Sequence, residues 1–191
     1  MTQLSRVALL VVLVGCSAQP VPSAPGTELY RVESPEAILQ AARSLMEADG
    51  NMALVTVDDD GQPRVRTVRA FLTDVDPADP GKGMTVWVMT RQSTRKVEQV
   101  RNHPRVTLYF NDDVKFSYLT IMGTGIVHTD PSVPAVQPFL KLEGYKEFFW
   151  PNFPEGFVMI EVRPHWIEFM GPGIRNHQEH WRPQSVVFPA R

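Results

Sequence analysis

The sequence of 191 residues has little cysteine, little net charge and no apolar run long enough to cross a membrane. Its single cysteine, Cys16, excludes an intramolecular disulfide. A formal net charge of −2 gives no indication of a nucleic-acid partner. The apolar run over residues 7–14 is shorter than the about 20 residues that span a bilayer. The length and the 43% of hydrophobic residues fit one globular domain, or one domain with a tail.

The N-terminus has the layout of a secretory signal. Arg6 closes a short polar start, the apolar run follows, and Leu13-Val14-Gly15-Cys16 resembles the bacterial lipoprotein signal box, which is cleaved before a cysteine that becomes lipid-modified. This implies a signal peptide over residues 1–15, and a lipidated Cys16 with a flexible tether rich in Pro, Ser and Ala over residues 16–29. The protein would be held by its lipid on the extracytoplasmic side of the bacterial cell envelope. The alternative is a buried N-terminal strand with a chance cysteine.

Hydrophobic patterns predict short strands and few helices in the rest of the chain. A helix is expected between the N-cap Ser34 and the stop Gly50, a second over residues 94–101 with Ser93 as its N-cap, and a third over residues 131–142. Strands are expected over residues 52–57, 63–71, 84–90, 105–111, 116–128, 157–162 and 166–170.

These patterns predict a mainly β fold with flanking helices. Six or seven strands, with Gly123 and Gly125 as bend or bulge positions, favour a small closed β-barrel. The segment 171–191 is expected to be mostly irregular. The aromatic segment 145–157 is expected to contribute core or dimer contacts, with a partner-docking surface as the alternative.

No metal site is predicted. The loop 73–83 holds three aspartates, but it lacks the Gly and the Glu that an EF-hand needs at its sixth and twelfth positions. His177 and His180 form an H-x-x-H pair with no further candidate ligand nearby.

Cations and hydroxyls gather at the start of the helix predicted over residues 94–101. Arg95 and Lys96 lie in its first turn, where the helix dipole disfavours cations. An anion between them and the hydroxyls of Thr90 and Thr94, most simply a phosphate, would explain the arrangement. A solvated basic turn is the alternative, and spacing alone leaves both readings open.

Two segments resemble the pyridoxamine 5′-phosphate oxidase-like flavoproteins. TRQSTRKVEQVRNHPRVTLYF resembles that family's T-x-x-x-S-R-K-x-x-Q-(I/L)-x-x-(N/H)-P-x-V, and GQPRVRTVRAF resembles its G-x-P-x-x-R-x-V strand. The resemblance covers residues 34–128 well and 157–177 loosely, and the general stress protein subgroup fits the length best. It implies an FMN-binding split barrel over residues 30–175, a tail over residues 176–191, and a homodimer with the flavin between its subunits.

The resemblance also implies which residues bind the cofactor. Those expected to bind the phosphate are Arg66, Arg95 and Lys96, with Thr94 as the best-aligned hydroxyl. Those expected to contact the ring or the ribityl chain are Thr67 and Val68, through their backbone, and Thr90. Tyr118 would be a polar contact from the partner subunit.

Departures from the family pattern argue against authentic pyridoxamine phosphate oxidation. Phe71 replaces a lysine, Met170 a flavin-stacking tryptophan, and Glu179 a flavin-binding arginine. The segment that grips the substrate phosphate has no counterpart in residues 131–157. Arg175 and His177 match substrate-contacting positions, although a plain polar tail is the alternative.

The sequence therefore predicts an FMN-dependent oxidoreductase whose substrate it does not identify. The flavin would carry out the hydride or electron transfer. The alternative is a non-catalytic lipoprotein that binds a flavin, a deazaflavin or haem, because a chain exported unfolded must find its cofactor outside the cytoplasm.

Overall fold

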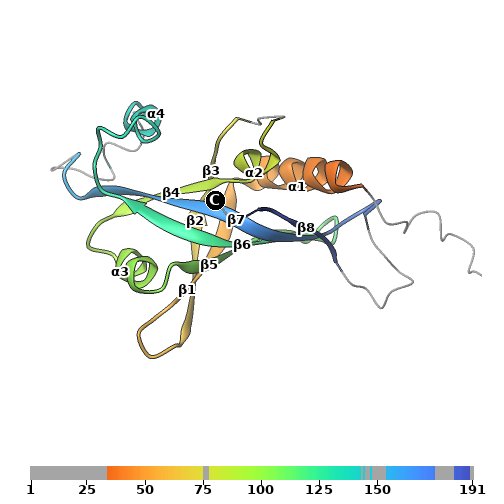
Figure 1. Cartoon of the computed structure of the whole chain (residues 1–191), viewed down its shortest axis with the longest axis horizontal. Coiled ribbons are helices and arrows are strands. Elements are labelled where there is room, and N and C mark those ends of the chain that lie inside the picture. The colour runs from red at the N-terminus through yellow and green to blue at the C-terminus, as the bar shows by residue number, and fades with distance from the viewer. Residues whose placement is uncertain are drawn as a thin grey trace, which may run out of the picture.

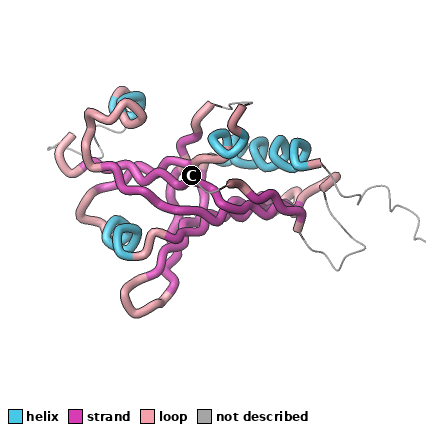
Figure 2. The backbone as a smooth tube through the Cα atoms, viewed as in Figure 1, coloured by secondary structure: helices cyan, strands magenta, loops and turns pink. Residues whose placement is uncertain are grey.

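The computed structural model describes residues 34–74, 78–142, 144, 147, 154–174 and 183–189. Strands dominate, and short helices flank them (Figures 1 and 2). In chain order the elements are α1 (Pro35–Asp49), β1 (Asn51–Val57), β2 (Pro63–Arg69), β3 (Phe71–Leu72), α2 (Pro80–Gly83), β4 (Val86–Arg91), α3 (Arg95–Asn102), β5 (Arg105–Asp112), β6 (Ser117–His128), α4 (Gln137–Leu140), β7 (Phe157–Met170) and β8 (Gln184–Val187). None of the helices in these ranges is long and apolar enough to span a bilayer.

The strands form one eight-stranded antiparallel sheet in the order β2-β1-β5-β6-β7-β4-β3, and β8 pairs with β7. The sheet is curled, as Figure 1 shows, so its two ends approach each other, and β2 contacts β4. No hydrogen-bonded ladder joins β2 to β4 in the described ranges. The fold is a split β-barrel, as the family resemblance implied, and not the closed barrel that the strand pattern favoured; the split lies between β2 and β4.

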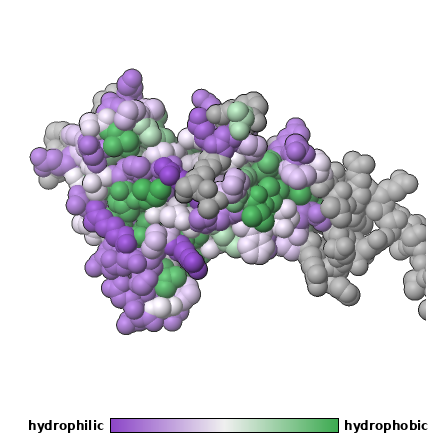
Figure 3. All heavy atoms as spheres, viewed as in Figure 1, coloured by the Kyte–Doolittle hydropathy of each residue, from purple (hydrophilic) through white to green (hydrophobic). Residues whose placement is uncertain are grey.

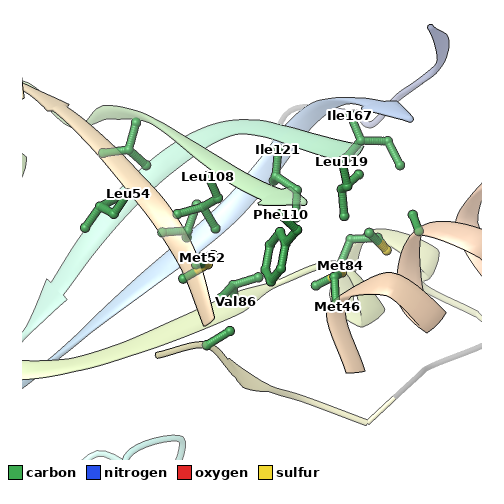
Figure 4. Close-up of a cluster of buried hydrophobic side chains, with 14 of the residues drawn as sticks. Met46, Met52, Leu54, Met84, Val86, Leu108, Phe110, Leu119, Ile121 and Ile167 are labelled. Atoms are coloured by element: carbon green, nitrogen blue, oxygen red, sulfur yellow. The ribbon is translucent and has the colours of Figure 1, made fainter. Parts of the chain in front are cut away.

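Alternate residues of each strand point to the inner face of the curled sheet, and their side chains form the core. Phe110 lies among aliphatic side chains from several strands, and Met46 of α1 and Met84 approach the same cluster (Figure 4). The other labelled core residues are Met52, Leu54, Val86, Leu108, Leu119, Ile121 and Ile167, all buried. A smaller cluster of Trp87, Val136, Phe157 and Met159 packs between the other face of the sheet and the α4 segment.

The first helix begins and ends where the sequence predicts. The Ser34 hydroxyl accepts a hydrogen bond from the Ala37 N–H at 3.3 Å, and Gly50 ends α1 in the left-handed conformation at φ 70°. Such a conformation favours glycine because it has no Cβ. The capped helix covers part of the core with Ile38, Ala42 and Met46.

The glycine prediction is confirmed at Gly123. The β6–β7 register shifts between Met122 and Gly123, and a Cβ at Gly123 would lie 2.2 Å from the Arg163 carbonyl oxygen. The register skips His165, the extra residue of the bulge, and pairing resumes on both sides of it, so the two strands predicted over residues 157–162 and 166–170 are one continuous strand, β7.

Three other expectations need correction. Only residues 137–140 of the predicted helix 131–142 are helical, because Pro134 and Pro138 lack the N–H that a longer helix needs. Part of the tail expected to be irregular forms β8, which pairs with residues 166–169 of β7, beyond the stretch paired with β4. Thr94, and not Ser93, occupies the N-cap position of α3.

Candidate functional site

A groove of about 360 Å³ lies at the split in the barrel. It is lined by Thr67, Val68 and Arg69 of β2, Phe71 of β3, Met89 and Thr90 of β4, Lys96 of α3, and Gly144. The volume falls in the range of about 300–1,000 Å³ that is usual for small-molecule sites. The structure therefore brings Thr67, Val68, Thr90 and Lys96, all predicted to bind the cofactor, to one groove.

The β2 wall of the groove has backbone groups that other strands do not use. In the described ranges β2 is an edge strand that pairs only with β1. Alternate N–H and C=O groups of such a strand point away from its neighbour. This edge can therefore offer backbone hydrogen bonds to a ligand in the groove, the role that the sequence predicted for Thr67 and Val68.

Arg66 is held on the inner face of β2 by neutral acceptors. It lies opposite Leu54 of β1, whose side chain is in the core. Its guanidinium donates to Thr56 Oγ1 at 2.6 Å, to Gln99 Oε1 at 2.9 Å and to the Leu54 carbonyl at 3.3 Å. Thr56 Oγ1 also donates to Gln99 Oε1 at 2.6 Å, and this bond holds the Gln99 side chain in position. These bonds fix the guanidinium in place without neutralising its charge.

Lys96 approaches the same place from α3. Its Nζ donates to Thr90 Oγ1 at 3.1 Å, and Thr90 Oγ1 lies 3.2 Å from Thr94 Oγ1. The Thr94 hydroxyl donates to the Arg91 carbonyl at 2.8 Å, so it makes no cap for the helix. The start of α3 thus combines uncapped backbone N–H groups with two threonine hydroxyls and a lysine.

The positive charges of Arg66, Arg95 and Lys96 favour the binding of an anion at the start of α3. Burial, and then the charge of Arg95, lowers the pKa of Arg66. Burial, and then the charge of Arg66, lowers the pKa of Lys96. Within the part of the chain that the structure describes, none of these cations forms an ion pair with a carboxylate. Partly buried cations whose pKa is lowered by burial and by a neighbouring cation, as for Arg66 and Lys96, mark a place where an anion would be stabilised.

A second, more polar hollow of about 180 Å³ lies beside these cations. It is lined by Asp58, Asp59, Arg64, Arg95, Glu98 and Gln99. Arg95 lines this hollow, whereas Lys96, the next residue along α3, lines the groove. Its carboxylates distinguish the hollow from the groove, whose described lining includes none.

Sequence reasoning missed Thr56 and Gln99, which orient Arg66. Gln99 occupies the Q position of the segment that resembles the flavoproteins, so a signal for it was present. Thr56 gave no such signal, because its place on the buried face of β1 reads as an ordinary core position.

The remaining predicted residues lie away from the groove or outside the described residues. Tyr118 is on β6, where its ring stacks on Tyr109 with centroids 5.9 Å apart. Burial, and then the charge of Glu168, raises the pKa of Tyr118. Cys16, Arg175 and His177 lie outside the described residues, as do His180 and Glu179.

Solved structures share this fold. The chain is similar to a Clostridium acetobutylicum protein related to general stress protein 26 of B. subtilis, with 22% identity, a TM-score of 0.62, and coverage of 81% of this chain and 97% of that chain. It is similar to a pyridoxamine 5′-phosphate oxidase-related, FMN-binding protein from Nostoc punctiforme PCC 73102, with 16% identity, a TM-score of 0.54, and coverage of 83% and 98%. It is also similar to a haem-binding protein from Mycobacterium smegmatis, with 14% identity, a TM-score of 0.58, and coverage of 82% and 60%.

Comparison with protein families gives a more specific result than these distant likenesses, which show the fold alone. The family model described as pyridoxamine 5′-phosphate oxidase matches residues 38–171. A comparison with curated proteins finds no significant match. The matched range includes the groove and its cations, and on this evidence the chain belongs to the pyridoxamine 5′-phosphate oxidase-like family.

Proposed function

We propose that the chain binds FMN in the groove at the barrel split and acts as an FMN-dependent oxidoreductase. The observation that carries the proposal is the cluster of Arg66, Arg95 and Lys96, which is unpaired with any described carboxylate and whose Lys96 lines the groove between β2 and β4. A phosphate fits the cation cluster, and a flat ring fits a groove lined by Val68, Phe71 and Met89. When bound, the flavin supplies hydride or electron transfer.

The chain's own residues would bind and orient the cofactor. An arginine has five N–H donors, of which Arg66 uses three within the protein, so two remain for a phosphate. The Lys96 ammonium has three donors, and Thr90 takes one of them. Because Thr56 and Gln99 hold Arg66 in position, little side-chain freedom is lost when the phosphate binds.

The lining of the groove favours cofactor chemistry over side-chain acid–base catalysis. The described lining includes no carboxylate, histidine or cysteine. Phe71 lies in the groove at a position where the oxidase proper has a lysine, which supports a reaction other than pyridoxamine phosphate oxidation. The same lining supports a second candidate, a non-catalytic protein that carries a flavin, a deazaflavin or haem. The similar Mycobacterium smegmatis structure is that of a haem-binding protein.

A second copy of the chain would complete the site. On the outer face of the sheet, Val65, Val55, Thr107, Met122, Trp166 and Val187 are direct cross-strand neighbours in one row over six strands. Val65, Trp166 and Val187 are 66%, 41% and 75% exposed. A row of this length that is apolar except for Thr107 favours a covered interface on this face of the sheet. Tyr118 lies on the same face of β6 as Met122, which suits its expected role as a contact to the partner's flavin.

The lipid anchor on Cys16 and the place of the protein on the extracytoplasmic side of the envelope remain part of the proposal. Their support is the signal-box resemblance alone. Mass spectrometry of the protein from its native membrane would detect the cleaved, acylated Cys16, and an intact N-terminus without lipid would contradict the anchor.

A comparison of FMN with riboflavin tests the phosphate site. Riboflavin has the same ring but no phosphate, so we expect it to bind on the order of 100-fold more weakly, as the loss of charge-assisted bonds to two cations implies. Arg66→Gln/Lys96→Gln should weaken FMN binding to about the riboflavin level and leave riboflavin binding unchanged. The control, Arg105→Gln/Lys115→Gln, removes two exposed cations elsewhere and should change neither. Equal affinities of the unaltered protein for FMN and riboflavin would contradict the proposal.

Turnover separates the two candidate functions. The FMN-loaded protein is mixed with reduced nicotinamide cofactors, and flavin reduction is followed by absorbance. Reduction faster than that of free FMN supports the oxidoreductase, and a rate equal to that of free FMN supports the carrier.

A further inference from the structure

The polar hollow lies directly beyond the cation cluster along β2. Arg64 of β2 lines the hollow, Arg66 belongs to the cation cluster, and Thr67 to Arg69 line the groove. α3 contributes to both sites, because Arg95, Glu98 and Gln99 line the hollow whereas Lys96 lines the groove. A ligand with its ring in the groove and its phosphate at the cations would therefore direct any group beyond the phosphate into the hollow.

Three carboxylates and two arginines line the hollow, so its described lining has one negative charge in excess. Asp58 is paired with Arg64, at 2.7 Å. Asp59 accepts a hydrogen bond from Asn102 Nδ2 at 3.0 Å and lies 3.2 Å from His103 Nε2, which is a cation only when protonated. Glu98 makes no ion pair within the described ranges. Arg95 is the remaining cation of the hollow. A phosphate bound at the cation cluster would neutralise part of its positive charge.

We propose that this acidic hollow determines which flavin the site accepts: one that ends in a phosphate, and not one whose phosphate carries a further anionic group. The inference rests on the proposed function, since it assumes that the phosphate lies among Arg66, Arg95 and Lys96. It assigns Asp59 and Glu98 a role in cofactor selection that neither the family match nor the fold gives them.

The candidate cofactors differ at this point of their structure. FMN ends in a phosphate monoester. FAD continues through a second phosphate to adenosine, and the deazaflavin F420 continues from its phosphate into a chain of carboxylates. Either extension would bring new negative charge beside Asp59 and Glu98, and like charges at short range disfavour binding. FMN binding leaves the hollow filled with water.

Binding affinities for FMN, FAD and F420 test the inference. They are measured for the unaltered full chain and for Asp59→Asn/Glu98→Gln, which keeps the size of both side chains and one acceptor oxygen in each while it removes both charges. The ratios Kd(FAD)/Kd(FMN) and Kd(F420)/Kd(FMN) should exceed one in the unaltered chain. In the variant both ratios should fall by about fivefold, the size of effect expected for two partly exposed charges. Because salt screens such charges, high salt should lower the same ratios in the unaltered chain.

A matched control separates the position of the charges from their number. Asp113→Asn/Glu47→Gln removes two exposed carboxylates that line neither the groove nor the hollow, and it should leave both ratios unchanged. A similar fall in the control would overturn the inference. So would tight FMN binding with FAD or F420 bound equally well, a result that leaves the proposed function intact. Failure of all three cofactors to bind would overturn the proposed function, and the inference with it.

Discussion

At the scale of single residues, the site depends on how Arg66 is held. Its contacts to Thr56, Gln99 and the Leu54 carbonyl come from β1 and α3, so the guanidinium links two elements. A lysine has the same charge, but it has no planar fork to reach these acceptors and a phosphate together.

Arg66→Lys should therefore weaken FMN binding by about tenfold, through the loss of a bidentate contact. Fluorescence titration with FMN measures the change. Arg105→Lys, the same substitution at an exposed position, is the control and should have no effect. Unchanged FMN affinity in Arg66→Lys would show that charge alone suffices at this position.

The lowered pKa of Lys96 predicts a pH dependence of FMN binding. Burial and the charge of Arg66 disfavour the ammonium, so the free protein loses this proton at a lower pH than an ordinary lysine does. A bound phosphate favours the ammonium and raises the pKa of Lys96 again. FMN affinity should then fall as the pH rises through the pKa of Lys96 in the free protein. Lys96→Arg, which stays charged, should remove that fall, whereas the same fall in Lys96→Arg would exclude Lys96 as its source.

At the scale of elements, local sequence signals predict the individual helices and strands more reliably than they predict how the strands pair. Ser34 and Gly50 mark the ends of α1 in the sequence because capping is local. The pairing of β8 with β7 is not local, since it depends on where β4 stops along β7. Likewise, the approach of β2 to β4 that forms the groove results from the curl of the whole sheet. Sequence reasoning reached Thr90 and Lys96 from the cations and hydroxyls at the predicted helix start, with a solvated basic turn as the alternative. It reached Thr67 and Val68 only through the family resemblance, and it assigned no role to Thr56 or Gln99.

The bulge between β6 and β7 gives a stability prediction. Gly123→Ala would place a Cβ 2.2 Å from the Arg163 carbonyl oxygen, so the ladder must shift. We expect the free energy of unfolding to fall by about 3 kcal/mol, as overpacking against backbone implies. Urea denaturation measures the change. Gly144→Ala, where a Cβ meets nothing within 4 Å, is the control and should change stability by less than about 0.5 kcal/mol. Equal stability of the two variants would show that the bulge adapts without cost.

At the scale of the whole molecule, some apolar side chains lie on the surface and not in the core. In the view of Figure 3 they form separate patches among polar side chains. The row on the outer face of the sheet crosses six strands and includes the exposed Trp166. We propose that a second copy covers this face and completes the flavin site.

Trp166→Lys should therefore shift a dimer toward monomer and weaken FMN binding in parallel. Analytical ultracentrifugation gives the mass, and circular dichroism checks that the fold is kept. Val114→Lys, at a position 83% exposed on the β5–β6 hairpin turn, is the control and should leave the dimer intact. A protein that is monomeric both with and without FMN would rule out the interface.

The central claim, a flavin held by its phosphate at the barrel split, is tested most directly by the absorption spectrum of the full chain purified under native conditions. We expect the spectrum of an oxidised flavin and, after denaturation, a released chromophore with the mass of FMN. The Arg66→Gln/Lys96→Gln protein should be colourless, and the Arg105→Gln/Lys115→Gln protein yellow. Protein that is colourless as purified and stays so when FMN is added would contradict the account.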